Sequence, residues 1–128
     1  LAIIGAASFE ADYPERLRVQ VRALGIDEAV QFLGNLEPAV VADWLAAADA
    51  FALATAREGC CNAVLEALAV GTPVVTTPVG DNAHFVKESV NGYLVPVDDS
   101  ESLAAAVGRV LSAPALAPRQ DIAAALQR

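Results

Sequence analysis

Residues 58–75 read EGCCNAVLEALAVGTPVV, a succession of loop, helix and strand signals. Apolar residues recur at helical spacing from Asn62 to Val70, and Gly71 then suits a left-handed helix cap because it has no Cβ atom. Pro73 bars a continuation of the helix and is followed by a short apolar run typical of a strand buried on both faces. The stretch therefore predicts a loop, a helix and a parallel strand in this order.

The same alternation extends along the chain on both sides. Short apolar segments alternate with segments of helical periodicity, which is the pattern of βαβ units around a parallel sheet. We therefore predict an α/β fold with a doubly wound, Rossmann-like parallel β-sheet. The expected strands are 1–5, 30–33, 50–54, 73–76 and 93–95, and the expected helices are 14–24, 38–48, 62–70, a short helix or turn in 80–88, a helix capped at 98–100, and 121–127.

The length of 128 residues fits a single core. We predict one domain over residues 1–112, followed over 113–128 by a proline-containing linker and a C-terminal helix. The sequence has no methionine and begins directly in an apolar run, so we expect it to be an excerpt of a longer protein. In the second helix, Trp44 occurs at an inward spacing, and we expect it in the core rather than stacked on a ligand.

Charge, hydropathy and cysteine content argue against nucleic acid, a membrane span and a metal site. The net charge is −8 with only 8 Lys and Arg and no basic cluster, so nucleic acid is not an expected partner. No apolar run approaches the roughly 20 residues that span a bilayer. Cys60 and Cys61 are adjacent, which disfavours a relaxed disulfide and the usual spacing of a zinc site, and we expect a reducing cytoplasm and no metal.

The loop before the 62–70 helix is where chemistry is expected. In an open parallel sheet, ligands bind beyond the carboxyl ends of the strands, and the amides at a helix N-terminus favour a phosphate or diphosphate. Gly59 lets a ligand approach the backbone closely. Glu58 and Glu66 would repel phosphate, so we expect them to accept hydrogen bonds from hydroxyls, with Asn62 on the same helix face as Glu66. A ligand with both anionic groups and hydroxyls is a sugar nucleotide.

The stretch from Glu58 to Val75 resembles the E-x7-E signature and the following G-x-P-V-V strand of family 4 retaining glycosyltransferases, which have the GT-B fold. Flanking segments agree in order, and the resemblance covers Leu1 to about Leu111. These segments read VQFLG at 30–34, ADA at 48–50, TPVG at 77–80 and NGYLVPVD at 91–98. The resemblance implies the C-terminal, donor-binding half of such an enzyme, with residues 1–112 as the nucleotide-sugar domain.

The resemblance also implies roles for individual residues. Glu58 is the catalytic candidate and would contact hydroxyls of the transferred sugar, while Glu66 would hold the ribose hydroxyls. Arg57 fits a phosphate contact and an ion pair with a nearby acid equally well. The other donor-binding candidates are Gly59, Cys60, Cys61 and Asn62 at the distal phosphate and sugar, Leu65, and Leu33, Gly34 and Asn35 beside the base.

The implied activity is retaining transfer of a glycosyl group of hexose type, from a UDP-, GDP- or ADP-sugar to an acceptor, without a cofactor. Polysaccharide biosynthesis is the pathway class that the resemblance suggests. An acceptor-binding N-terminal domain and a basic clamp on the diphosphate would lie outside this sequence, so we expect the excerpt alone to be inactive. We expect a cytoplasmic location, with any peripheral contact at the inner membrane face made by the part outside.

Two alternatives stay open from the residues themselves. A nucleotide-sugar epimerase of the same fold would use the same donor crevice and would need an acid/base pair. A flavodoxin-like binding or assembly module would perform no catalysis and would have no affinity for sugar nucleotides.

Overall fold

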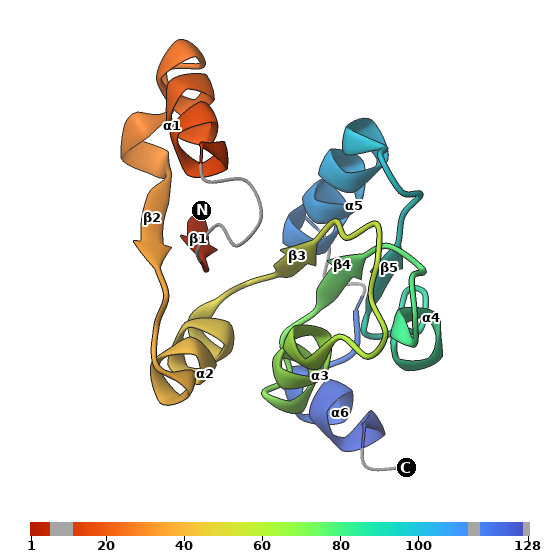
Figure 1. The fold of residues 1–128 in the computed structure, drawn as a ribbon. Coiled ribbons are helices and arrows are strands. Elements are labelled where there is room, and N and C mark those ends of the chain that lie inside the picture. The colour runs from red at the N-terminus through yellow and green to blue at the C-terminus, as the bar shows by residue number, and fades with distance from the viewer. Residues whose placement is uncertain (6–11, 113–115, 127–128) are drawn as a thin grey trace. The chain divides into compact units, whose positions relative to one another are not determined.

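The computed structural model describes residues 1–5, 12–112 and 116–126. The chain divides into two compact units, Leu1–Val41 and Ala42–Arg128, and each is described by itself. Both units combine parallel strands with helices, which confirms the predicted α/β class (Figure 1).

The first unit is built on a parallel pair of strands. β1 (Ala2–Ile4) pairs with β2 (Gln31–Gly34), and α1 (Tyr13–Ala23) and the 3₁₀ helix η1 (Asp27–Ala29) connect them. The sequence did not predict η1, because a single 3₁₀ turn has no periodicity to detect.

The second unit carries a three-stranded parallel sheet in the order β3-β4-β5. These strands are β3 (Phe51–Leu53), β4 (Val74–Thr76) and β5 (Gly92–Leu94). The central strand β4 is buried at every residue, as expected for a strand covered on both faces. On one face, Val75 and Tyr93 join the core with Ala106 and Val110 of α5 (Ser100–Ser112). The short apolar run after Pro73 was therefore correctly predicted as a buried strand.

Helices of the second unit lie close to their predicted positions. They are α2 (Pro38–Ala47), which begins in the first unit, α3 (Asn62–Ala69), α4 (Asn82–Phe85), α5 and α6 (Arg119–Ala125). In α2, Leu45 is buried, but Trp44 is 37% exposed, so the prediction of a core tryptophan is wrong. Adjacent helical residues point about 100° apart, and only one of this pair can occupy the centre of the buried stripe.

The C-terminal helix α6 packs against α3 (Figure 1). Ile122 of α6 is 1% exposed, and the Arg119 guanidinium donates hydrogen bonds to the backbone oxygens of Ala46, at 2.8 Å, and Ala48. Residues 113–115 of the predicted linker lie outside the described residues, and the predicted boundary at residue 112 stays a prediction. Arg119 thus ties α6 to the carboxyl end of α2 within the second unit.

Asp99 lies directly before α5 and caps it. Its carboxylate accepts hydrogen bonds from the hydroxyl of Ser102 at 2.6 Å and from the amide of Ser102 at 2.9 Å. These bonds, the hydroxyl's first, hold the pKa of Asp99 below its ordinary value of 3.8. A carboxyl group whose pKa is lowered on folding stabilises the fold at pH values above its ordinary pKa. This stabilisation is lost as the pH falls through the lowered pKa. The cap is therefore intact at neutral pH.

Candidate functional site

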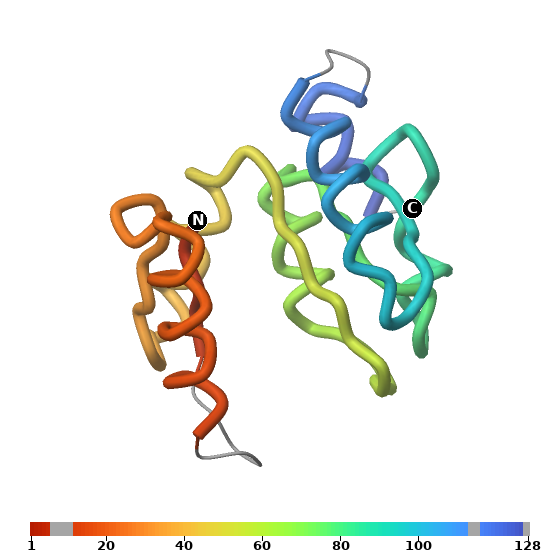
Figure 2. Tube along the Cα trace, turned by 90° about the horizontal axis from the view of Figure 1, so that it is seen from above, coloured from red at the N-terminus to blue at the C-terminus, as the bar shows by residue number. Residues whose placement is uncertain are grey.

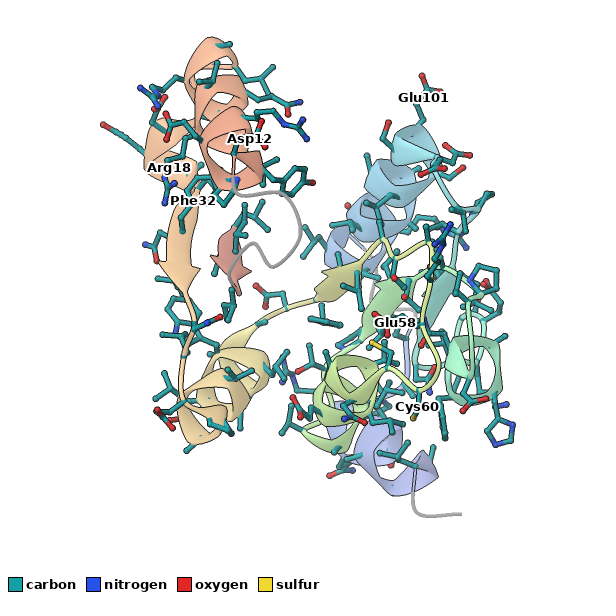
Figure 3. The ribbon with its side chains drawn as sticks, in the orientation of Figure 1. Asp12, Arg18, Phe32, Glu58, Cys60 and Glu101 are labelled. Atoms are coloured by element: carbon teal, nitrogen blue, oxygen red, sulfur yellow. The ribbon has the colours of Figure 1, made fainter. Side chains whose placement is uncertain are left out.

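The loop between β3 and α3 passes the carboxyl end of the sheet, as predicted. Figure 2 shows the yellow-green segment running beyond β3 before the chain turns back into α3. Arg57, Glu58, Gly59 and Cys60 are all exposed, and Figure 3 labels Glu58 and Cys60 in this loop. A Cβ atom added at Gly59 would meet nothing within 4 Å. We call residues 55–61 the donor loop from here on.

The N-terminus of α3 presents unused hydrogen-bond donors. Cys61 is the N-cap residue, and its side chain makes no capping hydrogen bond. Its carbonyl accepts from the amides of Val64 at 3.1 Å and Leu65 at 3.3 Å. In the described part of the chain, no acceptor receives a hydrogen bond from the amides of residues 59–63. These amides, at the positive end of the helix dipole, are suited to an anion.

Glu58 is oriented from within the donor loop. The single hydroxyl hydrogen of Thr55 is shared between the backbone oxygen of Arg57 at 3.2 Å and Oε1 of Glu58 at 3.5 Å. The amide of Arg57 in turn donates to the Thr55 hydroxyl at 3.4 Å. Thr55 thus closes a short turn that carries the Glu58 carboxylate. No role was predicted for Thr55 from the sequence.

The outer face of α3 carries the second carboxylate. Val64, Ala67 and Leu68 form the buried face of the helix, whereas Glu66 and Asn62 are exposed and Leu65 is half-buried. Asn62 and Glu66 are one helical turn apart, so the exposed pair shares a face, as expected. The structure therefore places Glu58, Asn62 and Glu66 on one continuous segment, from the donor loop to the second turn of α3.

Arg57 supplies a cation to the donor loop. Among the residues that the structure describes, no carboxylate forms an ion pair with it, and the ion pairs seen are confined to α1 and its N-cap. Of the two readings of Arg57, this geometry favours the one in which the guanidinium is available to a ligand. The two cysteines differ: Cys60 is exposed, whereas Cys61 is 6% exposed and is part of the core.

The loop after β4 also reaches the donor loop, although no role was predicted for its individual residues. The Thr77 hydroxyl donates to the backbone oxygen of Thr55 at 2.5 Å, and the amide of Asp81 donates to that of Gly59 at 3.1 Å. Gly80 lies against the backbone of Glu58 and Gly59. A signal was present in the sequence: Thr76 and Thr77 are consecutive polar residues at the end of an apolar strand, where a buried hydroxyl must find a partner.

The residues predicted beside the base lie in the first unit. Leu33 and Gly34 are at the carboxyl end of β2, and Asn35 follows them. Gly34 lines a pocket of about 550 Å³ together with residues of β1 and α1. At this pocket, the Arg18 guanidinium carbon lies 4.9 Å from the centre of the Phe32 ring (Figure 3). Contact of these residues with a base stays a prediction.

The described residues contain neither a metal-binding cluster nor a membrane-spanning helix. No group of three or more His, Cys, Asp or Glu side chains in residues 1–5, 12–112 and 116–126 is arranged to hold a metal ion. Within the same ranges, no helix is long and apolar enough to cross a membrane.

Comparisons with known proteins bear on the family of the chain. The family model described as glycosyl transferases group 1 matches residues 1–113. D-inositol 3-phosphate glycosyltransferase of Streptomyces griseus is 37% identical over 112 residues, which cover 88% of this chain and 24% of that protein. The chain spans about a quarter of the length of the first curated relatives that it matches.

Solved structures are similar to this chain over nearly its whole length. HepE of Anabaena, in complex with UDP and glucose, superposes with a TM-score of 0.80 at 28% identity, over 98% of this chain and 32% of that one. Sucrose-phosphate synthase of Thermosynechococcus elongatus superposes with a TM-score of 0.85 at 26% identity, over 98% of this chain and 33% of that one.

Proposed function

Because the chain belongs to the group 1 glycosyl transferases, we propose that it binds the nucleoside diphosphate sugar for a retaining glycosyl transfer, as a member of family 4. Its fold is the Rossmann-like fold found in the C-terminal half of GT-B glycosyltransferases. Membership favours transfer over the epimerase and over a module without catalysis. We take the donor to be a hexose linked to UDP, GDP or ADP, and the complex of HepE with UDP supports testing UDP first.

The amides at the start of α3 are the single observation that carries the proposal. The donor's diphosphate accepts hydrogen bonds from the backbone amides of residues 59–63, which have no acceptor in the described part of the chain. Charge-assisted bonds of this kind are roughly twice as strong as neutral ones. The amides hold the distal phosphate, and Arg57 adds a positive charge beside them.

The two carboxylates act on the hydroxyls at either end of the diphosphate. Glu66, exposed on the second turn of α3, holds the ribose hydroxyls, and Glu58 in the donor loop holds hydroxyls of the transferred sugar. Hydroxyls donate to carboxylates, so neither group needs to approach a phosphate. Binding both ends fixes the position of the anomeric carbon and its bond to the distal phosphate.

Catalysis then rests on charge stabilisation at the leaving group. As the bond between the sugar and the distal phosphate breaks, negative charge grows on the diphosphate. Preorganised amides and a helix N-terminus stabilise that charge without reorganising. The acceptor hydroxyl attacks the anomeric carbon on the face from which the diphosphate leaves, and its proton passes to the departing diphosphate oxygen. The anomeric configuration is thus retained without a protein nucleophile.

The acceptor is bound by a domain outside this sequence. This part of the proposal rests on the share of its relatives that the chain spans, which is 24% for the Streptomyces griseus enzyme. We propose that the present chain alone does not transfer sugar, and that the full-length enzyme acts in the cytoplasm. Contacts of Leu33, Gly34 and Asn35 with the base and of Leu65 with the donor are part of the same proposal.

A proline at position 62 tests the role of the α3 amides. Asn62 is the first residue of α3, where proline is tolerated. Cys61 before it has φ −86° and ψ 94°, which is extended backbone rather than the helical backbone that a following proline disfavours. Asn62→Pro therefore removes one amide donor and keeps the helix. In the full-length protein, calorimetric titration should show UDP binding at least roughly tenfold weaker for Asn62→Pro than for Asn62→Ala, because a hydrogen bond to a charged group is lost.

Asn62→Ala is the matched control, because it removes the same side chain and keeps the amide. Equal UDP affinities for the two variants, at similar melting temperatures, would sink the assignment of the diphosphate to the first turn of α3. If UDP does not bind, GDP and ADP are titrated in the same way. Absence of binding by all three at millimolar concentration, an affinity of about −4 kcal/mol, would count against the donor site itself.

A further inference from the structure

We propose that the loop after β4, residues 77–82, is the element that positions the donor loop, and that Thr77 is its principal positioning residue. This inference rests on the proposed function and names residues that do not themselves touch the donor. We call residues 77–82 the support loop. Its contacts with the donor loop join backbone to backbone and side chain to backbone across segments far apart in the sequence.

Thr77 begins a chain of hydrogen bonds that ends at the catalytic candidate. Its side chain is 1% exposed, and its hydroxyl donates to the backbone oxygen of Thr55 at 2.5 Å. The Thr55 hydroxyl then shares its one hydrogen between the backbone oxygen of Arg57 and Oε1 of Glu58. Fixing the Thr55 backbone therefore fixes the turn from which the Glu58 carboxylate extends.

A second contact orients an amide that we assign to the diphosphate. The amide of Asp81 donates to the backbone oxygen of Gly59 at 3.1 Å. In a planar trans peptide, the C=O and N–H groups point in opposite directions. Because the Gly59 oxygen faces the support loop, the amide of Cys60 in the same peptide faces away from it. The support loop thus directs this donor toward the open side of the loop.

Close backbone packing leaves this arrangement little freedom. Gly80 has φ +57°, and a Cβ atom added to it would lie 2.6 Å from the backbone oxygen of Glu58 and closer still to that of Gly59. The two loops therefore meet at backbone distance, without an intervening side chain that could change rotamer. The donor loop can move only if the support loop moves with it.

Asn82 holds the support loop from behind. It is 1% exposed, and its side-chain nitrogen donates to the Thr76 hydroxyl at 3.2 Å and to the backbone oxygen of Thr77 at 3.1 Å. The Thr76 hydroxyl donates onward to the backbone oxygen of Leu53 at 2.8 Å. Fully satisfied buried networks of this kind rigidify a structure, and removing one member leaves its partner unpaired. The network extends from the end of β3 to the start of α4.

Thr77→Val tests the proposal, because valine keeps the shape of threonine and removes its hydroxyl. In the full-length protein, we expect UDP to bind roughly tenfold more weakly to Thr77→Val, since a smaller share of molecules holds the donor loop in the binding conformation. We expect kcat to fall as well, because the turn that carries Glu58 is loosened. Thr77→Ser retains the hydroxyl and should restore both values to within about twofold of wild type.

Thr72→Val is the matched control. Thr72 is 0% exposed, and its hydroxyl donates to the backbone oxygen of Leu45 at 2.6 Å, before β4 rather than after it. The Thr72 hydroxyl also accepts from the Arg119 guanidinium at 3.3 Å. Thr72→Val therefore removes a buried hydroxyl donor, as Thr77→Val does, and one further contact besides, away from the donor loop. Both valine variants should lower the free energy of unfolding, but only Thr77→Val should weaken UDP binding and lower kcat.

A readout without nucleotide separates this inference from the proposed function. The amide of Asp81 should exchange its hydrogen faster in Thr77→Val than in wild type. In Thr72→Val, its exchange rate should equal that of wild type. Equal effects of the two valine variants on Asp81 exchange and on UDP affinity would overturn the positioning role of Thr77. Thr77 would then contribute to stability alone. If wild type binds no UDP but only Thr77→Val frees the Asp81 amide, the proposed function fails while the positioning of the loop stands.

Discussion

Replacing Glu58 by glutamine in the full-length enzyme should lower the rate of sugar transfer by roughly 100-fold, the scale of losing one preorganised polar contact in a transition state. The substitution keeps size and shape, and it removes the charge that sugar hydroxyls donate to. Affinity for UDP should stay within about twofold, because we assign Glu58 to the sugar and not to the nucleotide. Initial rates with a panel of nucleoside diphosphate hexoses, and calorimetry with UDP, measure the two quantities separately.

Glu101→Gln is the control for Glu58→Gln. Glu101 is an exposed carboxylate in the first turn of α5, far along the chain from the donor loop (Figure 3). Its replacement should leave transfer unchanged, although it alters the net charge equally. Transfer by Glu58→Gln at the wild-type rate would remove Glu58 from the catalytic site.

Gly92→Ala should destabilise the second unit by about 3 kcal/mol or more, a large share of the stability of a typical domain. Gly92 begins β5, and a Cβ atom there would overlap the backbone oxygen of Val74 and lie 2.9 Å from its carbonyl carbon. Val74 belongs to the central strand β4 and is 0% exposed, so its backbone cannot move aside. A urea titration followed by circular dichroism measures the effect.

Gly108→Ala is the same substitution at a position with the opposite expectation. Gly108 lies inside α5, is exposed, and has open space where a Cβ would be. Alanine should stabilise the helix there by about 0.5–1 kcal/mol, because glycine loses more backbone entropy on folding. If Gly92→Ala unfolds at the same urea concentration as Gly108→Ala, the close packing of β5 on β4 described above is wrong.

Elements with strong local signals were predictable from the sequence. The Gly71 cap and Pro73 mark the end of α3, and the observed helix ends at Ala69, one residue before the prediction. Gly71 indeed has φ +78°, the left-handed region that favours glycine. The predicted N-cap of α5 is confirmed for Asp99. An N-cap carboxylate accepts a hydrogen bond from the amide three residues later, which here is that of Ser102.

The site was predictable only in its contiguous part. Glu58, Asn62 and Glu66 lie on one segment, so helical spacing alone brings the last two to one face. The polar pair Thr76 and Thr77 signals that a buried hydroxyl needs a partner, but no local pattern identifies that partner as Thr55, which is 22 residues away. Gly80 could be recognised as a turn residue, but its approach to Glu58 and Gly59 depends on how two loops meet in space.

Amide hydrogen exchange of the full-length protein, with and without a saturating nucleoside diphosphate, tests the central claim most directly. The amides of residues 59–63 donate no hydrogen bond within the described chain, so they should exchange fast without ligand. A diphosphate bound at the N-terminus of α3 should slow the exchange of these amides. The exchange of the amides in α5 should not change comparably. Saturation by UDP, GDP or ADP that leaves these amides unprotected would contradict the proposed donor site.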